Sequence, residues 1–412
     1  MSDILQRGAL TGLRVLDLSR VLAGPWSGQL LADLGADVVK VERPGAGDDT
    51  RAWGPPWLSG ADGQAAGESA YFLSTNRNKR SVTIDLSEPE GQRLVRQLAS
   101  KADVVLENFK VGGLTQYGLD YASLRKENQR LIYCSITGFG QTGPYAPRAG
   151  YDFLIQGMGG LMSLTGRADG TEGEGPLKVG VALTDVTTGL YATVAVLAAL
   201  AHRERSGEGQ YIDLALLDVQ IACLANQATN YLVGGVVPRR MANAHPSIVP
   251  YQDFPTADGY LIIAVGNDGQ FERLCRSLDR PGWSADGRFA TNPQRVKHRD
   301  ELVALIRGVT VCRTTDEWIA VMEAAGVPCG PINSLDKVFA DPHVQAREMR
   351  IEMPHALAEQ VSLVANPIRM SESPVQYRRP PPTLGEHTAE VLGDWLDMTS
   401  MDIAVLYQKR IV

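Results

Sequence analysis

Asp185 has the most distinctive surroundings of any acidic residue in this chain. It lies in the segment Gly180-Val-Ala-Leu-Thr-Asp-Val-Thr-Thr-Gly189, whose small and apolar residues precede a long apolar stretch. Aspartate is a preferred residue at a helix N-cap, so one interpretation of Asp185 is purely structural. The other is chemical, because a carboxylate at a helix N-terminus stays ionised near neutral pH and can act as a covalent nucleophile. The residues alone leave both interpretations open.

Further polar residues stand beside apolar runs that are predicted to be strands. Arg43 follows one such run, Asn108 and Phe109 follow another, and the basic cluster Asn78-Lys79-Arg80 stands before a third. Open α/β sheets bind ligands at the carboxyl ends of their strands. If these groups converge there, they suit a nucleotide with several phosphates. Each charge, taken singly, also fits an ordinary solvated surface.

The motifs of several common enzyme classes do not occur. The turn from Ser19 to Pro25 lacks the G-x-G-x-x-G pattern of a dinucleotide-binding turn, and the P-loop, H-E-x-x-H and G-x-S-x-G patterns are missing from the sequence. The five cysteines form no Cys-x-x-Cys pair, and the six histidines show no metal-ligand spacing. The sequence therefore predicts neither an NAD dehydrogenase nor a metal site.

Composition is that of an ordinary globular protein. The 412 residues are 44% hydrophobic and 21% charged, and a chain of this length favours two or three domains. The net charge of −7 argues against a general nucleic-acid-binding protein. No apolar run reaches the roughly 18 residues of a membrane span, and residues 1–12 lack the apolar core of a signal peptide. We therefore expect a cytoplasmic protein without nucleic-acid or membrane partners.

The elements that would position these residues alternate between strand and helix signals. Helices are predicted at 25–34, 88–101 and 187–202, between short apolar runs. This βαβ rhythm predicts an α/β fold with a parallel sheet and helices on both faces, a doubly wound Rossmann-like domain. The expected strands are 13–18, 37–42, 80–86, 103–107, 131–136 and 210–216.

A second, smaller α/β domain is predicted further along the chain. The character of the sequence changes at 234–250, where Gly, Pro and Arg replace any periodicity, so this segment is interpreted as a linker or active-site loop. Strand and helix signals then alternate again over 251–330. After Pro331 the chain is predicted to be irregular until two final helices at about 387–396 and 400–408.

Nine segments, in order along nearly the whole chain, resemble the class III CoA-transferases. This family includes the formyl-CoA and carnitine CoA-transferases and α-methylacyl-CoA racemase. A single segment would be a weak signal, but the ordered set is specific. The segments are LDLSRVLAGP (16–25), LGADVVKVERPGAGD (34–48), NRNKRSVTIDL (76–86), ENF (107–109), ITGFGQTGPYA (136–146), GYD (150–152), TDVTTGLYA (184–192), GVPCGPI (326–332) and LGEHT (384–388).

The resemblance implies roles for individual residues. Asp185 matches the aspartate that becomes acylated in the transferases of this family. A CoA thioester is then a cosubstrate, and the resemblance implies no metal or organic cofactor. The residues implied at the CoA site are Arg20, Leu22, Ala23, Arg43, Lys79, Ile84, Asn108, Phe109 and Tyr151.

The resemblance also implies an interlocked homodimer, in which two ring-like subunits pass through each other. Residues 1–225 with 336–412 are then expected to form a large CoA-binding and catalytic domain. Residues 226–335 are expected to form the small domain with its linkers, which agrees with the change of character at 234–250.

Two positions depart from the family patterns. Gln116 stands where formyl-CoA transferases carry an arginine, so one phosphate contact is lost. Tyr151 stands where the racemase branch carries a histidine, and a phenol with a pKa near 10 is a poor base at neutral pH. CoA transfer is therefore the expected activity. The alternatives are an acyl-CoA racemase that uses Asp185 in α-proton transfer and a CoA-binding protein without catalysis.

Within the family, the sequence is most similar to succinyl-CoA–glutarate CoA-transferases, for example in ERPGAGDDTRAWGPP (42–56). We therefore expect succinyl-CoA as donor and a C4–C6 dicarboxylate such as glutarate as acceptor. The second carboxylate of such an acid needs a cation in a dry pocket. Arg148, just before Tyr151, and Arg240, in the loop leading to His245, are the candidates. Both arginines could instead be solvated, or Arg148 could hold CoA.

Overall fold

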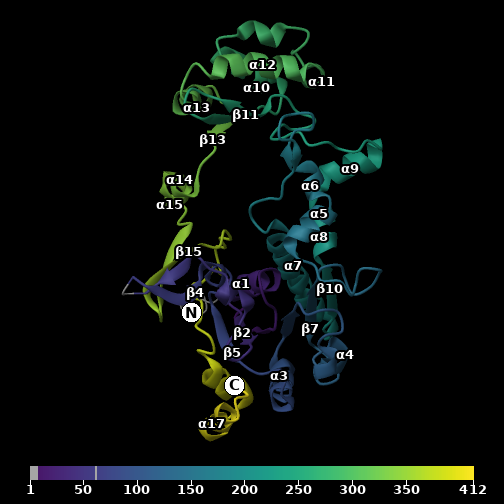
Figure 1. The fold of residues 1–412 in the computed structure, drawn as a ribbon, viewed down its shortest axis with the longest axis vertical. Coiled ribbons are helices and arrows are strands. Elements are labelled where there is room, and N and C mark those ends of the chain that lie inside the picture. The colour runs from purple at the N-terminus through teal and green to yellow at the C-terminus, as the bar shows by residue number, and fades with distance from the viewer. Residues whose placement is uncertain (1–7, 61–62) are drawn as a thin grey trace. The chain divides into compact units, whose positions relative to one another are not determined.

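The computed structural model describes residues 8–60 and 63–412, which form two compact units (Figure 1). The predicted domain limits are 225/226 and 335/336, whereas the units divide at 236/237 and 344/345. Residues 162–177, which were not expected to leave the large domain, belong with the smaller unit. Unit 1 contains the chain up to Leu161, Lys178–Val236 and Gln345–Val412, and unit 2 contains Met162–Leu177 and Val237–Val344.

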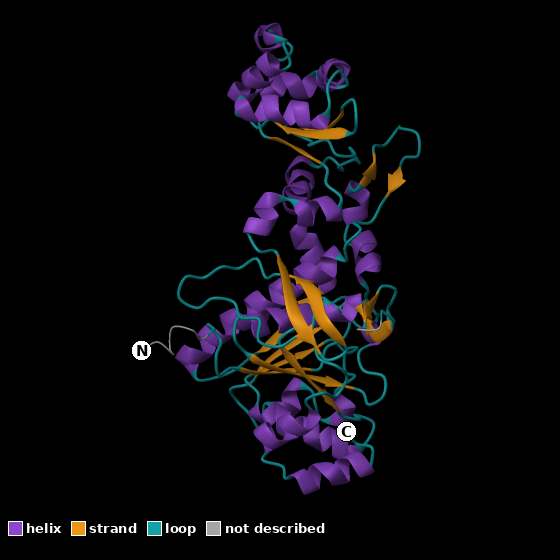
Figure 2. Cartoon of the chain, turned by 90° about the vertical axis from the view of Figure 1, so that its left-hand side faces the viewer, coloured by secondary structure: helices purple, strands orange, loops and turns teal. Residues whose placement is uncertain are grey.

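Unit 1 is built on the six-stranded parallel sheet that the sequence predicts (Figure 2). From one edge to the other, its strands follow the order β5-β2-β1-β6-β7-β10, with all neighbours parallel. Counted along the chain, this is 3-2-1-4-5-6, the order of a Rossmann sheet, whose topological switch point lies between β1 and β6. The strands are β1 (Arg14–Asp17), β2 (Asp37–Glu42), β5 (Lys79–Thr83), β6 (Val104–Glu107), β7 (Ile132–Thr137) and β10 (Tyr211–Ala215).

Helices cover both faces of this sheet because successive strand residues point to opposite sides. Val15 packs into a core with α1 (Ala23–Asp33) and α7 (Leu183–Ser206). Leu16, the next residue, packs into a second core on the other face. The helices of that second core are α3 (Pro89–Lys101), α16 (Thr388–Leu396) and α17 (Ser400–Gln408).

The C-terminal segment completes unit 1. The backbone N–H of Asn78 donates to the carbonyl of Arg379, and that of Asp85 donates to the carbonyl of Ile411. The segment before α16, predicted to be irregular, contains an antiparallel hairpin of β14 and β15. The remaining elements of unit 1 are β3 (Trp57–Ser59), β4 (Ala65–Ser69), α2 (Ala70–Leu73), α4 (Tyr121–Leu124), α5 (Asp152–Met158), α8 (Leu216–Cys223), α9 (Ala225–Gly234), β14 (Arg350–His355), β15 (Ala358–Val364) and short 3-10 turns at Asp49–Ala52 and Thr115–Tyr117.

Among the described residues, α7 is the one helix whose length and composition would allow it to cross a membrane. The expectation that no such apolar stretch exists is therefore too strict. Its buried residues pack on the sheet and on α1, where the hydroxyls of Thr193 and Ser27 lie 3.0 Å apart. In this fold one side of α7 packs into the core of unit 1.

Unit 2 contains a three-stranded antiparallel sheet covered by helices. Its strand order is β11-β12-β13, and its core includes Phe254, Phe271 and Trp318. Strands and helices alternate here, as predicted for residues 251–330. The elements are α6 (Leu161–Leu164, at the boundary), β8 (Gly166–Arg167), β9 (Gly175–Pro176), β11 (Tyr251–Pro255), β12 (Tyr260–Ala264), α10 (Asp268–Ser277), a 3-10 turn at Pro281–Ala285, α11 (Asn292–Lys297), α12 (Arg299–Thr310), α13 (Thr315–Ala324), β13 (Cys329–Pro331), α14 (Leu335–Ala340) and, across the second boundary, α15 (Pro342–Ala346).

Candidate active site

A pocket in unit 1 lies at the switch point between β1 and β6. Its walls come from the segments that follow β1, β6 and β7 and from the first turn of α7. This is where open α/β sheets bind ligands, because the loops from the two neighbouring strands diverge there. The pocket brings together eight of the residues expected at the site: Arg20, Leu22, Ala23, Asn108, Phe109, Arg148, Tyr151 and Asp185.

Asn108 joins the loops that follow β1 and β6. Its side-chain oxygen accepts from the backbone N–H of Arg20 at 2.9 Å, and its amide donates to the carbonyl of Arg20 at 2.7 Å. The guanidinium of Arg20 lies 5.4 Å from the ring centre of Phe109 and 3.4 Å from the carboxylate of Asp49. Asn108 therefore shapes the pocket wall through the backbone as well as lining the pocket.

Asp185 is the third residue of α7 and not its N-cap, which is Ala182. The structural interpretation of Asp185 as a capping residue is therefore wrong. Asp152, at the start of α5, supplies the missing acceptor, since its carboxylate accepts from the backbone N–H of Thr184 at 2.8 Å and from the amide of Gln156 at 2.7 Å. The Asp185 carboxyl group is left to face the pocket.

The pKa of Asp185 is raised to about 7, first by burial and then by the negative charge of Asp152. The position at a helix N-terminus predicts that this group stays ionised near neutral pH, and the direction of that prediction is wrong. Desolvation penalises the charged form of a carboxyl group, and a nearby carboxylate adds to the penalty. At neutral pH, Asp185 therefore exists in both protonation states.

Tyr71, on α2, is a site residue that the sequence analysis missed. Burial, followed by the charges of Asp185 and Asp152, raises the pKa of Tyr71 to about 12, so its phenol stays protonated and can donate a hydrogen bond. Its ring meets that of Trp53 edge-to-face at 5.2 Å. Neither Tyr71 nor Asp152 stands in a motif of its own, and only the fold brings them near Asp185.

Lys79 does not reach the pocket, contrary to expectation. Its side chain is fully buried, and its ammonium group donates to Asp17, to the carbonyl of Pro25 and to Asn76 at 2.8–3.0 Å. An ammonium group that is enclosed in this way has no donor left for a phosphate. Ile84 is also a correction, because its side chain is 1% exposed and belongs to the hydrophobic core. Arg43 is exposed after β2, as predicted, outside the pocket walls.

Arg148 is held at the pocket by aromatic rings. Its guanidinium lies 4.6 Å from the ring centre of Tyr145 and 5.1 Å from that of Phe139. Among residues 8–60 and 63–412, no carboxylate forms an ion pair with it. Its positive charge is therefore available to an acidic ligand in the pocket that also contains Asp185.

The other two residues proposed for the acceptor belong to unit 2 and have partners there. Arg240 forms an ion pair with Asp169, whose backbone N–H donates to the Arg240 carbonyl. The ring of His245 lies 5.3 Å from that of Tyr251, and its Nδ1 accepts from the backbone N–H of Ser247. In the part of the chain that the structure describes, no cluster of His, Cys, Asp and Glu could hold a metal ion.

The family model of CoA-transferase family III matches residues 10–388. The chain belongs to this family. Among its relatives in CoA-transferase family III, the succinate–glutarate CoA-transferase of Agrobacterium fabrum is 56% identical over 96% of this chain and 98% of its own length. The succinyl-CoA:glutarate CoA-transferase of Homo sapiens is 42% identical over 100% of this chain and 91% of its own.

Solved structures with the same fold extend the comparison. A CAIB/BAIF family protein from Brucella suis is 51% identical, with a TM-score of 0.84 over 95% of this chain and 100% of that one. Rv3272 from Mycobacterium tuberculosis is 33% identical, with a TM-score of 0.81 over 93% and 99% of the two chains. The mixed α/β fold built on a parallel sheet is thus that of the CoA-transferase family III.

Proposed function

We propose that this enzyme transfers CoA from succinyl-CoA to a C4–C6 dicarboxylate such as glutarate. The names of its relatives support this choice of substrates, since one of 40% identity from Haloarcula hispanica is also a transferase between dicarboxylates, a succinyl-CoA:mesaconate CoA-transferase. The observation that carries the proposal is the Asp185 carboxyl group, which faces a pocket at the switch point of the sheet without a capping role.

Asp185 is the nucleophile in the proposed mechanism. Its carboxylate attacks the thioester carbonyl of succinyl-CoA, which gives a succinyl–aspartyl anhydride and the CoA thiolate. The thiolate attacks the aspartyl carbonyl, so that succinate leaves and an aspartyl-CoA thioester remains. Glutarate then attacks this thioester and forms a glutaryl–aspartyl anhydride, again with release of the thiolate. Attack of the thiolate on the glutaryl carbonyl yields glutaryl-CoA and restores Asp185.

Each intermediate in this scheme is sensitive to water, so the surroundings of Asp185 matter as much as the nucleophile. Burial that raises the pKa of a carboxyl group also marks a poorly solvated site. The phenol of Tyr71 stays protonated close to that carboxyl group and suits the stabilisation of an oxyanion. The scheme uses CoA as a cosubstrate and needs no metal or organic cofactor.

CoA recognition is assigned to residues along the same edge of the sheet. Arg20, Leu22, Ala23, Asn108, Phe109 and Tyr151 line the pocket, and we assign the thioester end of CoA to it. Arg43 is exposed after the neighbouring strand β2, which suits a contact with the phosphates. Lys79 and Ile84 act on this site only through the fold.

Arg148 is our choice for the cation that binds the second carboxylate of the acid. It lines the pocket with Asp185, and the two aromatic rings hold its guanidinium while no carboxylate neutralises it. A guanidinium can bind both oxygens of a carboxylate, which an ammonium group cannot do. Donor and acceptor would use it in turn, since both acids carry a second carboxylate.

A second copy of this chain is the proposed partner, in an interlocked homodimer. Unit 1 exposes large apolar side chains on three helices: Phe153 on α5, Val194 on α7, and Leu232 and Val233 on α9. The last two are 78% and 83% exposed, which is a large solvent-facing apolar surface for a monomer. Symmetric pairing of such faces is the commonest way to bury them. We place the dimer in the cytoplasm.

The test is transfer of CoA from succinyl-CoA to glutarate, followed by trapping of the intermediate. Wild-type enzyme should form glutaryl-CoA, and incubation with succinyl-CoA alone should leave a mass adduct on Asp185 that hydroxylamine removes. Asp185→Asn should bind CoA within about threefold of wild type and lose the adduct and turnover, because an amide cannot form the anhydride. Full turnover by Asp185→Asn would refute the proposal, and α-proton exchange in heavy water without transfer would indicate a racemase.

A further inference from the structure

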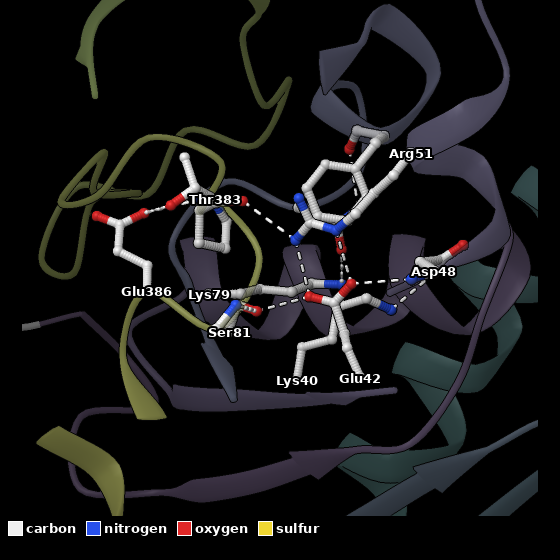
Figure 3. Close-up of polar contacts among 12 residues, drawn as sticks. Lys40, Glu42, Asp48, Arg51, Lys79, Ser81, Thr383 and Glu386 are labelled. Atoms are coloured by element: carbon white, nitrogen blue, oxygen red, sulfur yellow. Dashed lines mark hydrogen bonds and ion pairs between the residues drawn. The ribbon is translucent and has the colours of Figure 1, made fainter. Parts of the chain in front are cut away.

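Unit 1 contains a network of buried charges (Figure 3). At its centre, the ammonium group of Lys40 lies 2.9 Å from the carboxylate of Asp48, and both side chains are 0% exposed. Arg51 continues the network and pairs with Glu42 at 2.8 Å and with Glu68 at 2.6 Å. Burying ion pairs costs desolvation energy, and hydrophobic residues often stabilise a core as well. A gain in stability therefore does not explain these charges, whereas the backbone geometry that they hold can do so.

The two central charges both bind the backbone of the turn between β1 and α1. The ammonium group of Lys40 donates to the carbonyl of Ser19 at 2.7 Å. The carboxylate of Asp48 accepts from the backbone N–H of Val21 at 3.2 and 3.3 Å, and from the backbone and hydroxyl of Thr50. The ion pair thus closes a bridge between two points of one turn, two residues apart.

Val21 is strained at that point. Its φ of 71° lies in the left-handed region, which β-branched residues rarely adopt because their side chain meets the backbone. Seven other non-glycine residues in the described part of the chain have a positive φ, and none of them is β-branched. Strain of this kind persists only where the surrounding structure holds it, and it is frequent at functional sites.

The strained turn forms the pocket wall that α7 approaches. Arg20, Val21, Leu22 and Ala23 line the pocket together with Asp185. One turn of helix beyond Asp185, a Cβ on Gly189 would lie 2.7 Å from the carbonyl oxygen of Ala23, so the turn and α7 are in close contact. A change in the backbone at Val21 would therefore move the pocket wall relative to the Asp185 carboxyl group.

We propose that Asp48, anchored by Lys40, is a positioning residue that holds Val21 in its left-handed conformation and so sets the pocket wall opposite Asp185. The proposal rests on the proposed CoA transfer at Asp185. Neither Asp48 nor Lys40 lines the pocket, so their effect on catalysis passes through the backbone of the turn.

The experiment is a rescue by glycine, which adopts a positive φ without strain. Kinetics with succinyl-CoA and glutarate are compared for the wild type, Val21→Gly, Asp48→Ala and the double variant. Asp48→Ala should lower kcat by about 10- to 100-fold with a smaller change in KM, as expected when reacting groups are misplaced. Glycine keeps a positive φ without the hydrogen bond to Asp48, so the kcat of the double variant should recover to within about threefold of that of Val21→Gly alone.

The matched control is Asp397→Gly in the Asp48→Ala background. Asp397 also has a positive φ, at 55°, but it ends α16, away from the pocket-lining segments. Asp397→Gly should not restore the activity that Asp48→Ala loses. A double variant as slow as Asp48→Ala, or equal rescue by Asp397→Gly, would show that Asp48 does not act through the Val21 backbone.

Two further measurements keep the test decisive. Asp48→Ala leaves the buried Lys40 charge without this partner, and the variant could then fail to fold. In that case the variant that combines Lys40→Met and Asp48→Ala takes its place, and it is compared with and without Val21→Gly. Val21→Gly should also have a higher Tm than Val21→Ala, and the opposite order would overturn the proposal. A wild type that binds CoA but transfers none would instead refute the proposed function, and the Kd for CoA across the same variants would then decide the role of Asp48.

Discussion

The carboxyl group of Asp185 lies in the first turn of α7, yet its pKa is raised rather than lowered. The sequence motifs pointed to Asp185 as a candidate nucleophile, and the long apolar stretch after it indicated that it lies near the start of a helix. The sequence could not show the direction of the pKa shift, because that depends on burial and on Asp152, which α5 brings close. The sequence also could not show that Lys79, which is expected at the CoA site, is enclosed by Asp17 and Asn76.

The pH profile should report the pKa of Asp185. The nucleophile is the carboxylate, and the group is protonated below its pKa of about 7, so kcat/KM for succinyl-CoA should rise with pH and level off above about 7. Asp152→Asn keeps an oxygen for the N–H of Thr184 but removes the like charge, so it should move the midpoint to lower pH. A flat profile between about pH 5.5 and 8.5 would contradict the assignment.

Stability should show the cost of this carboxylate. Because the folded pKa is raised, ionisation of Asp185 destabilises the fold progressively above the unfolded value of 3.8, and the cost is complete above about 7. Asp185→Asn should therefore unfold at higher urea concentration than wild type at pH 8, by about 1–3 kcal/mol after allowance for partial exposure, with a smaller gain at about pH 5. A less stable Asp185→Asn at pH 8 would argue that the carboxylate is well solvated.

Arg148 should decide the preference for dicarboxylates. Arg148→Ala is expected to reduce kcat/KM for glutarate by about 10- to 100-fold and to leave that for valerate, which has one carboxylate, nearly unchanged. Arg148→Lys should recover only part of the loss, because lysine binds a carboxylate as a point charge. The exposed Arg93, on α3, is the control. Equal use of glutarate and valerate by the wild type would show that Arg148 does not select dicarboxylates.

At the scale of elements, the strongly periodic segments were predictable and the short ones were not. All six strands of the parallel sheet and the helices α1, α3 and α7 occur where apolar runs and helix signals stand in the sequence. The hairpin of β14 and β15 was missed although its strands alternate exposed and buried residues, because no tight-turn motif stands between them. Long-range contacts with the rest of unit 1, and not local propensity, stabilise such short strands.

The contact between α1 and α7 should tolerate no side chain at Gly189. A Cβ there would lie 2.7 Å from the carbonyl oxygen of Ala23 and 3.0 Å from the Trp26 side chain, and backbone cannot yield cheaply. Gly189→Ala should therefore lower stability by about 1–3 kcal/mol and slow transfer. Gly393→Ala, in α16, meets its nearest atom at 3.9 Å and should be stabilising, as helix glycines usually are when replaced by alanine. Similar melting curves for the two variants would contradict the close contact.

At the scale of the whole molecule, the sequence predicted a second domain but not its limits. Residues 162–177 lie far along the chain from the rest of unit 2, and the ion pair of Asp169 with Arg240 helps to join them to it. Residues 165–176 are rich in glycine and charged residues, which indicates a loop but does not show which unit that loop joins. The predicted limit is 225/226, whereas unit 1 continues through α9 to Val236, close to the change of character at 234–250.

Assembly can be tested on α9. Leu232→Asp combined with Val233→Asp places two charges on the proposed dimer face, where burying an unpaired charge is costly. Light scattering should show a dimer for wild type and a smaller species for this variant. Met401→Asp, at a 79% exposed position on α17, should leave the mass unchanged. A monomeric, fully active wild type would refute the dimer.

The position of α16 and α17 has a consequence for biosynthesis. These helices supply Trp395, Ile403 and Leu406 to the core on one face of the sheet, yet they follow every other part of unit 1 along the chain. A ribosome releases the six strands long before these two helices. Until then, part of one sheet face stays bare, and such surface on a nascent chain attracts chaperones and promotes aggregation. Unit 1 can therefore complete its folding only after α16 and α17 have been synthesised.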